Sequence, residues 1–175
     1  MKQIEPFGPF ALAANVIPVV VPSPAGELSG LLTGPSAPAL VDGIPAISAA
    51  SSPDAAGENR ALLVPGYTGS KEDYAPVLPF LGDAGWDVLA YSQRGQGGSA
   101  APAGLGAYGM SDFVNDLIAV AEAWAGTSGR VHLVGHSFGG IVARAAVIAR
   151  PDLFASVTLF CSGRAVYDWM NTLPI

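Results

Sequence analysis

Short apolar runs separated by turn residues recur along the chain. Four of them are four or five residues long and mainly apolar: 61–64, 87–91, 131–134 and 157–160. Two further runs lie nearer the start, at 16–21 and 27–32, with the turn-forming sequence Pro-Ser-Pro-Ala-Gly between them. Apolar runs of this length, bounded by turn residues, are typical of strands. The pattern therefore predicts six strands, of which the first two are joined by a turn.

Three segments between these strands predict helices: 70–82, 111–124 and 138–150. In the second segment, apolar residues fall on one face at helical spacing. Ser70 and Ser111 are candidate N-caps of the first two helices, because a serine oxygen can accept from the free N–H groups of a helix start. Pro76 and Pro79 are expected to break or bend the first helix, and Pro151 to end the third.

Strands that alternate with helices indicate the α/β class: a mostly parallel sheet with helices on both faces, in three layers. The first two strands are expected to pair antiparallel at one edge. We predict an N-terminal extension over 1–15, followed by one domain over 16–175. Within that domain, residues 34–59 are rich in Pro, Ala and Ser without a sustained period, and are expected to form a flexible insertion or loop.

Composition narrows the classes of function. The net charge is −6 and the eight Lys and Arg residues are scattered, which argues against a nucleic-acid partner. No window approaches the roughly 20 apolar residues of a membrane span, and residues 1–14 lack the pattern of a secretory signal. We therefore expect no membrane span and a cytoplasmic location. The single cysteine, Cys161, lies in an apolar run and is interpreted as a small buried hydrophobic residue.

Metal and nucleotide sites are not expected. The two histidines have no clustered acids beside them, so the chain offers no metal-ligand set. The glycines around 135–140 lack the Lys-Ser/Thr ending of a phosphate-binding loop. We predict neither a metal nor a cofactor.

One junction between a predicted strand and a predicted helix carries candidate chemistry. The strand at 131–134 runs into Gly-His-Ser-Phe-Gly at 135–139, and the helical pattern begins at once. So abrupt a reversal forces strained backbone at its apex, and the flanking glycines let strand and helix approach. The Ser137 hydroxyl would then stand clear at the carboxyl edge of the sheet, beside the unpaired N–H groups of the helix. Negative charge forming on a substrate oxygen would be stabilised there.

From about residue 16 to its end, the chain resembles the N-terminal part of the α/β-hydrolase family, which includes esterases, lipases, thioesterases and acyltransferases. The Gly-His-Ser-Phe-Gly run in its strand-to-helix context carries this resemblance and implies that Ser137 is the nucleophile. Pro65-Gly66-Tyr67 matches the family's His-Gly-x segment. The match implies that the backbone N–H groups of Tyr67 and Phe138 form the oxyanion hole. Pro65 replaces the family's histidine, which leaves a backbone donor in place.

The resemblance extends to the turn Ser-Gln-Arg-Gly-Gln-Gly-Gly-Ser at 92–99, which matches the family's Asp-x-Arg-Gly-His-Gly-x-Ser. Ser92 and Gln96 depart from that pattern, so the charge pairing of the family's aspartate does not carry over. Arg94 and the glycines of the turn are interpreted as structural. Asp116, on the following helix, also fits the family pattern and is interpreted in the same way.

The partners that would activate the serine are harder to find. A serine hydroxyl needs a base within hydrogen-bond reach, and in this family the acid and the histidine follow the serine. Both histidines precede Ser137. His132 lies roughly 15 Å back along the strand, and His136 is expected to point away from the serine and to line the pocket. Asp168 is a candidate for the acid, but the preferred interpretation of residues 164–175 is the start of a cap.

Two hypotheses of function follow. The first is a serine hydrolase that acts on an ester, thioester or similar acyl bond of a small molecule through an acyl-serine intermediate. The second is a non-catalytic fragment or binding module, or an acyltransferase or perhydrolase that uses the same serine. An epoxide hydrolase is disfavoured, because those relatives carry Asp where Ser137 stands.

Both hypotheses treat 16–175 as an incomplete α/β-hydrolase domain, truncated before the catalytic histidine and inactive alone. The last two strands of the family's sheet are then missing. We expect an open apolar edge at 157–160 and poor solubility. The substrate and the oligomeric state stay open.

Overall fold

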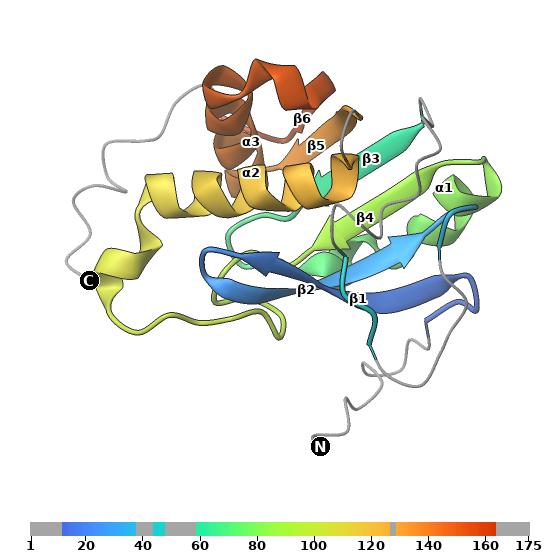
Figure 1. Cartoon of the computed structure of the whole chain (residues 1–175), viewed down its shortest axis with the longest axis horizontal. Coiled ribbons are helices and arrows are strands. Elements are labelled where there is room, and N and C mark those ends of the chain that lie inside the picture. Colours follow the sequence, from blue (N-terminus) through green and yellow to red (C-terminus); the bar gives the residue numbers. More distant parts are fainter. Residues whose placement is uncertain (1–11, 38–43, 48–58, 127–128, 164–175) are drawn as a thin grey trace.

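The computed structural model of the chain describes residues 12–37, 44–47, 59–126 and 129–163 (Figure 1). These residues form one six-stranded sheet in the order β1-β2-β4-β3-β5-β6. The strands are β1 (Val16–Ser23), β2 (Gly26–Thr33), β3 (Arg60–Val64), β4 (Asp87–Tyr91), β5 (Val131–His136) and β6 (Phe154–Phe160). β1 and β2 pair antiparallel at one edge, as do β2 and β4, and the remaining pairs are parallel. All six predicted strands are therefore confirmed.

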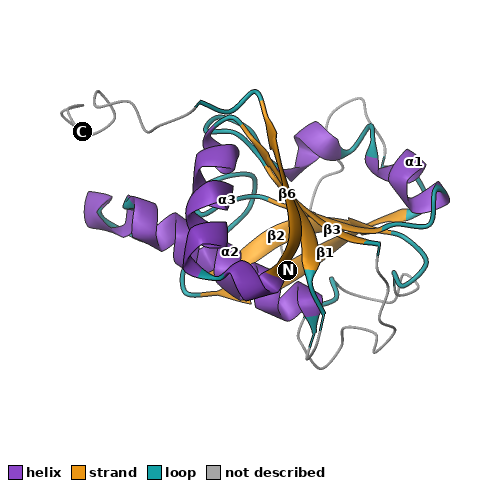
Figure 2. Cartoon of the chain, turned by 90° about the horizontal axis from the view of Figure 1, so that it is seen from above, coloured by secondary structure: helices purple, strands orange, loops and turns teal. Residues whose placement is uncertain are grey.

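Helices cover both faces of the sheet. The longer ones, α2 (Met110–Ala125) and α3 (Phe138–Ala149), lie on one face, and the short α1 (Leu78–Asp83) lies on the other (Figure 2). Single-turn helices complete the described structure at Lys71–Tyr74, Leu105–Tyr108 and Pro151–Leu153. Each face has its own apolar core. The three-layer α/β prediction is confirmed.

The predicted helix starts need correction. Gly109, not Ser111, is the N-cap of α2, and its N–H donates to the Asp112 carboxylate at 3.0 Å. Ser70 precedes a single turn as predicted, but its hydroxyl makes no capping hydrogen bond. Instead the Asp73 carboxylate accepts from the Ser70 N–H at 3.3 Å. In both places an acidic side chain three residues into the helix satisfies the free N–H of the cap residue.

The predicted helix over 70–82 is split in two. The turn at Lys71–Tyr74 ends before Pro76, and α1 starts at Leu78 with Pro79 in its first turn. Proline has no N–H to donate inside a helix, yet its fixed φ suits a first turn. The break expected at Pro76 is therefore confirmed, while Pro79 helps to begin the second helix.

Part of the proline-rich stretch packs on the sheet. The Val20 N–H donates to the Pro45 carbonyl at 3.0 Å, and the Ile47 N–H donates to the Val20 carbonyl at 2.8 Å. Ile47 is buried. Residues 44–47 therefore lie along β1. The rest of the predicted insertion that lies outside the described residues stays a prediction, as do the extension over 1–11 and the cap over 164–175.

At the opposite edge, β6 pairs with β5, and no other described strand adjoins it. Most of its side chains are exposed, including Val157, Leu159 and Phe160. Cys161, directly after this strand, is exposed as well, so its interpretation as a buried hydrophobic residue is wrong. No helix among the described residues is long and apolar enough to cross a membrane.

Parallel strands end on the same side of a sheet, and this fact locates the candidate site. β4, β3 and β5 are neighbours in that order and run in the same direction. The segments that follow their carboxyl ends are the turn 92–99, the loop 65–69 and the junction 135–140. The fold therefore brings all three family-like motifs to one edge.

Candidate active site

Ser137 sits at a sharp reversal between β5 and α3. Its φ of 51° and ψ of −117° are values that an L-residue rarely adopts. The end of β6 holds this strained residue from both sides. The Ser137 N–H donates to the Phe160 carbonyl at 2.9 Å, and the Ser162 hydroxyl donates to the Ser137 carbonyl at 2.9 Å. We call residues 135–140 the elbow.

The glycines of the elbow are required by close backbone approach. A Cβ on Gly139 would lie 2.5 Å from the Val64 carbonyl oxygen and would also overlap the Pro65 carbonyl. A Cβ on Gly135 would lie 2.6 Å from the Gly140 Cα. These distances leave no room for a side chain at position 135 or 139, so the backbone of α3 contacts β5 and the end of β3 directly.

An open cavity of about 280 Å³ lies between the elbow and the segment after β3. Its lining combines backbone, three hydroxyls, an imidazole and a carboxylate, from Gly66, Tyr67, Thr68, Gly69, Asp73, His136 and Ser137. Sequence analysis singled out Tyr67, His136 and Ser137, and the structure brings these three to one cavity. It missed Thr68, Gly69 and Asp73. Their position directly after a buried strand was the available signal.

Tyr67 and Phe138 also lie close together. Their rings meet edge to face with centroids 5.7 Å apart, and the Tyr67 side chain is 69% exposed. The backbone N–H groups of these two residues donate to no other group in the described part of the chain. Tyr67 belongs to the cavity lining and Phe138 follows Ser137 directly in the chain, so the assignment of their N–H groups as oxyanion donors stays a prediction.

The two histidines have different surroundings. His132 Nδ1 lies 2.8 Å from the Ser156 hydroxyl, and its ring meets Trp86 edge to face with centroids 5.2 Å apart. These contacts hold His132 in the sheet, away from the elbow. His136 lines the cavity with its ring 5.5 Å from that of Phe160. Neither ring is hydrogen-bonded to Ser137, and Asp168 lies outside the described residues.

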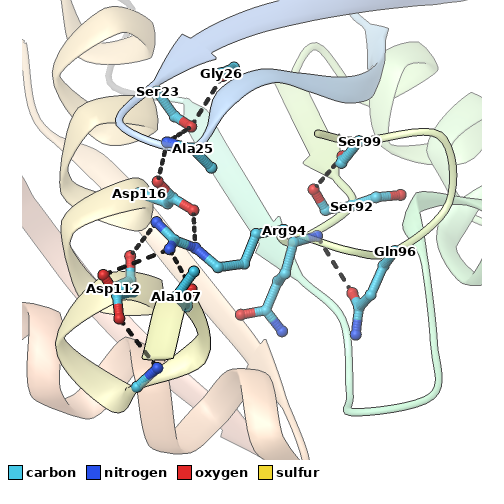
Figure 3. Close-up of polar contacts among 12 residues, drawn as sticks. Ser23, Ala25, Gly26, Ser92, Arg94, Gln96, Ser99, Ala107, Asp112 and Asp116 are labelled. Atoms are coloured by element: carbon cyan, nitrogen blue, oxygen red, sulfur yellow. Dashed lines mark hydrogen bonds and ion pairs between the residues drawn. The ribbon is translucent and has the colours of Figure 1, made fainter. Parts of the chain in front are cut away.

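Behind the elbow and the loop, Arg94 ties the turn 92–99 to α2 (Figure 3). Its Nε donates to Asp116 Oδ2 at 2.7 Å, and its other nitrogens donate to the carbonyls of Ala107 and Asp112. The hydrogen bond to Asp116 raises the pKa of Arg94 above its ordinary value. Asp116 also accepts from the Ala25 N–H at 3.1 Å. Both side chains are buried, and their structural interpretation is confirmed.

Ser92, which stands where the family pattern has an aspartate, is buried and hydrogen-bonded. Its hydroxyl accepts from the Lys71 N–H at 3.1 Å, and its carbonyl accepts from the Ser99 hydroxyl at 2.7 Å. The Lys71 N–H is a neutral donor, and the neutral Ser92 hydroxyl satisfies it. No charge pair forms at Ser92.

Tyr74 contacts the end of β3, where the loop 65–69 begins. Its hydroxyl donates to the Val64 carbonyl at 2.9 Å. Burial, with a smaller contribution from the nearby Asp73 carboxylate, raises the pKa of Tyr74 well above its ordinary value. The Tyr74 hydroxyl therefore keeps its proton as a donor over the neutral and moderately alkaline range.

Within the described residues, no group of three or more His, Cys, Asp or Glu side chains could hold a metal ion. The side chains that line the cavity supply the hydroxyls of Tyr67, Thr68 and Ser137, one imidazole and one carboxylate.

Known proteins resemble this chain in sequence and in fold. The alpha/beta hydrolase fold family matches the chain over residues 62–174. The "Putative carbamate hydrolase RutD" of Variovorax paradoxus (strain S110) is 39% identical over 98 residues, which cover 56% of this chain and 36% of that protein. Epoxide hydrolase A of Mycobacterium tuberculosis (strain ATCC 25618 / H37Rv) is 33% identical over 96 residues, 55% of this chain and 29% of that protein.

Among solved structures, an epoxide hydrolase from an endophytic Streptomyces superposes with a TM-score of 0.65 and 28% sequence identity. The superposition covers 84% of this chain and 37% of that one. The chain thus spans about a third of the length of the curated relatives it matches. Since the family match extends over most of the chain, from β3 through the elbow and beyond β6, this chain belongs to the alpha/beta hydrolase fold family.

Proposed function

We propose that this chain carries the nucleophile of a serine hydrolase, and that Ser137 attacks an ester, thioester, carbamate or similar acyl bond of a small molecule. The observation that carries the proposal is the backbone of Ser137, with its positive φ at the apex between β5 and α3 and its place on the cavity wall. Strain of this kind persists only where the surrounding structure enforces it, and it is concentrated at functional sites.

The proposed reaction runs in two steps. Ser137 Oγ attacks the carbonyl carbon as its proton passes to a base, and the carbonyl oxygen becomes an oxyanion. The N–H groups of Tyr67 and Phe138 stabilise that oxyanion, since neither is committed to another described group. Collapse expels the alcohol, thiol or amine, which takes the proton and leaves acyl-Ser137. Water then attacks the acyl group, releases the acid and restores the hydroxyl.

The chemistry of serine favours an acyl substrate over an epoxide. An oxygen nucleophile that opens an epoxide forms a bond to a saturated carbon. A carboxylate nucleophile gives an ester in this way, and water can hydrolyse it. Ser137 would give an ether, which water does not cleave, so turnover would stop after one event. The serine therefore supports the carbamate-hydrolase relative as a guide to the reaction more than the epoxide hydrolases.

The proposal also concerns the base that accepts the proton of the Ser137 hydroxyl. His132 is occupied by Ser156 and packs on Trp86, and His136 is not hydrogen-bonded to Ser137. We therefore propose that a histidine outside residues 1–175 serves as the base, and that the 175-residue chain alone reacts slowly.

The test is labelling of the 175-residue chain with a fluorophosphonate, which Ser137 attacks at phosphorus with loss of fluoride. We expect slow labelling that Ser137→Ala abolishes and that His136→Gln leaves unchanged. Imidazole added to the solution should accelerate the labelling, because it supplies the missing base.

Three other outcomes would overturn parts of the proposal. Labelling that survives Ser137→Ala, or no labelling even with imidazole, contradicts the nucleophile and favours a binding module. Rapid labelling without imidazole contradicts the missing base. If the rapid reaction is lost in His136→Gln, then His136 is the base.

A further inference from the structure

Three consecutive carbonyls in the loop 65–69 accept hydrogen bonds from glutamine side chains. Gln93 Nε2 donates to the Pro65 carbonyl at 3.0 Å. Gln96 Nε2 donates to the carbonyls of Gly66 and Tyr67, at 3.0 Å and 2.7 Å. Both glutamines belong to the turn 92–99, about thirty residues further along the chain. Side chains from the turn after β4 therefore hold the loop after β3.

Because of the geometry of the peptide bond, the hydrogen bond from Gln96 to the Gly66 carbonyl also orients the Tyr67 N–H. The Gly66 carbonyl and the Tyr67 N–H belong to the same peptide unit, which is planar and trans. The two groups therefore point in opposite directions. Gln96 holds the carbonyl on one side, together with the Gly69 N–H, which donates to the same oxygen at 3.2 Å, so the Tyr67 N–H is directed to the other side. The glycine at 66 matters here, because its permissive backbone would otherwise let the whole peptide unit rotate.

Gln96 is itself held in place. Its Oε1 accepts from the Gln93 N–H at 3.2 Å. Gln93 is 1% exposed. A primary amide suits the role of Gln96, because it presents N–H donors to two carbonyls and one oxygen to an N–H. A carboxylate of the same shape would place negative charge against both carbonyls.

We infer that Gln96 is a positioning residue, which with Gln93 behind it directs the Tyr67 N–H toward the cavity. The inference rests on the proposed function in one respect: it takes the Tyr67 N–H as a donor to the oxyanion. Gln96 does not touch the substrate. It acts through the peptide unit of Gly66 and Tyr67.

Labelling kinetics provide the first test. Fluorophosphonate labelling in the presence of imidazole is measured for the parent chain and for Gln96→Glu, as a function of probe concentration. A misdirected donor should lower the limiting rate at least about tenfold, since losing one such donor typically costs 10²–10³-fold. The probe concentration at half-maximal rate should change less than about twofold, because binding of the ground state does not require the oxyanion.

Two further variants separate positioning from loss of structure. Gln96→His keeps one ring N–H donor and should recover most of the rate. Asn15→Asp is the matched control: it also replaces an amide by a carboxylate, at an exposed position whose amide donates to Asp83. We expect its rate to equal that of the parent. Equal limiting rates in the parent and Gln96→Glu, with Ser137 labelled in both, would overturn the inference while leaving the proposed function intact.

A second measurement tests the inference even if Ser137 proves unreactive. The order parameter of the Tyr67 amide is measured by ¹⁵N relaxation in the parent and in Gln96→Glu. We expect a fall from about 0.85, typical of rigid backbone, to below about 0.6, with no change at Leu133 in β5. An unchanged Tyr67 amide would overturn the inference by itself. If Gln96→Glu does not fold, Gln96→Met removes the donors without adding charge and serves in its place.

Discussion

The elbow at 135–140 and the loop at 65–69 face the same cavity, but different interactions hold them. The elbow is fixed mainly by backbone: glycines that admit no Cβ and a hydrogen bond from the Ser137 N–H to the Phe160 carbonyl, with one side-chain hydrogen bond from Ser162. The loop depends more on side chains, because the amides of Gln93 and Gln96 donate to three of its carbonyls, beside one backbone hydrogen bond from the Gly69 N–H to the Gly66 carbonyl. One half of the site is thus set by steric exclusion, and the other by a few replaceable donors.

This difference suggests how each half tolerates change. A backbone contact cannot adjust when a methyl group is inserted, so substitutions in the elbow should act on folding as a whole. A side-chain donor can be removed with the backbone still in place, so substitutions around the loop should act more locally. The predictions below test this contrast, from the largest expected effect to the smallest.

The largest effect is expected where the two regions touch. Gly139→Ala places a Cβ 2.5 Å from the Val64 carbonyl oxygen, with further overlap at Pro65. Backbone on both sides would have to move, so we expect a loss of at least about 3 kcal/mol in the free energy of unfolding. Urea denaturation measures this loss. Gly106→Ala is the control, because a Cβ there meets no atom within 4 Å. Equal destabilisation by both variants would refute the steric account.

A comparable effect is expected at the ion pair behind the turn 92–99. Asp116→Ala leaves the buried Arg94 without its buried carboxylate partner and the Ala25 N–H with the Ser23 hydroxyl as its remaining acceptor. Breaking a buried pair from one side should cost about 3 kcal/mol of unfolding free energy. Glu122→Ala removes an exposed partner of Arg150 and should leave the denaturation midpoint unchanged. A small change in Asp116→Ala would mean that the turn keeps its place without this anchor.

A smaller effect should appear where β6 holds the elbow. A Cβ on Gly140 would overlap the Ser162 side chain, so Gly140→Ala should cost about 2 kcal/mol. Ser162→Gly removes the obstacle together with the hydrogen bond to Ser137, at a cost of about 1 kcal/mol. In the double variant the overlap with the Ser162 side chain is gone. The loss of unfolding free energy in the double variant should therefore be smaller than the sum of the two single losses by at least about 1 kcal/mol. Strict additivity of the measured unfolding free energies would contradict the contact.

The smallest effect is expected at the Tyr74 phenol, which contacts the end of β3. Tyr74→Phe removes the hydrogen bond to the Val64 carbonyl and should cost about 1 kcal/mol at neutral pH. Burial raises the pKa of Tyr74 above its ordinary value of 10.0. The folded state then holds this proton more tightly than the unfolded state does. Its stabilising contribution is complete below pH 10 and is lost as the pH rises further.

Urea denaturation between pH 8 and about 11 checks this dependence. Stability of the parent should fall above pH 10, and the fall should be shallower in Tyr74→Phe. Tyr91 is fully buried and also has a raised pKa, so Tyr91→Phe should remove part of the same fall. Identical pH profiles for the parent and Tyr74→Phe would show that the Tyr74 phenol does not contribute to it.

The strands and the elbow could be predicted because their signals are local. Apolar runs at 131–134 and 157–160 are read within a few residues, and so is the Gly-His-Ser-Phe-Gly run. The motif at 135–139 predicts the reversal at Ser137 from a short window of sequence, whereas the contacts of the elbow with Val64, Phe160 and Ser162 appear only in the structure. The helix caps were less predictable. Asp112 and Ser111 can both satisfy a helix start, and only the structure selects between them.

By itself, the sequence determined the class of fold, the six strands and the place of the serine, because periodicity and local sterics settle those features. Only the tertiary structure decided what holds the loop 65–69. The amides of Gln93 and Gln96 reach that loop because β4 and β3 are parallel neighbours in the sheet. Strand order depends on packing between distant segments, and no window of sequence records it. The physical reason is the distance along the chain: periodicity and turn motifs are read within a few residues, whereas these hydrogen bonds join residues about thirty positions apart.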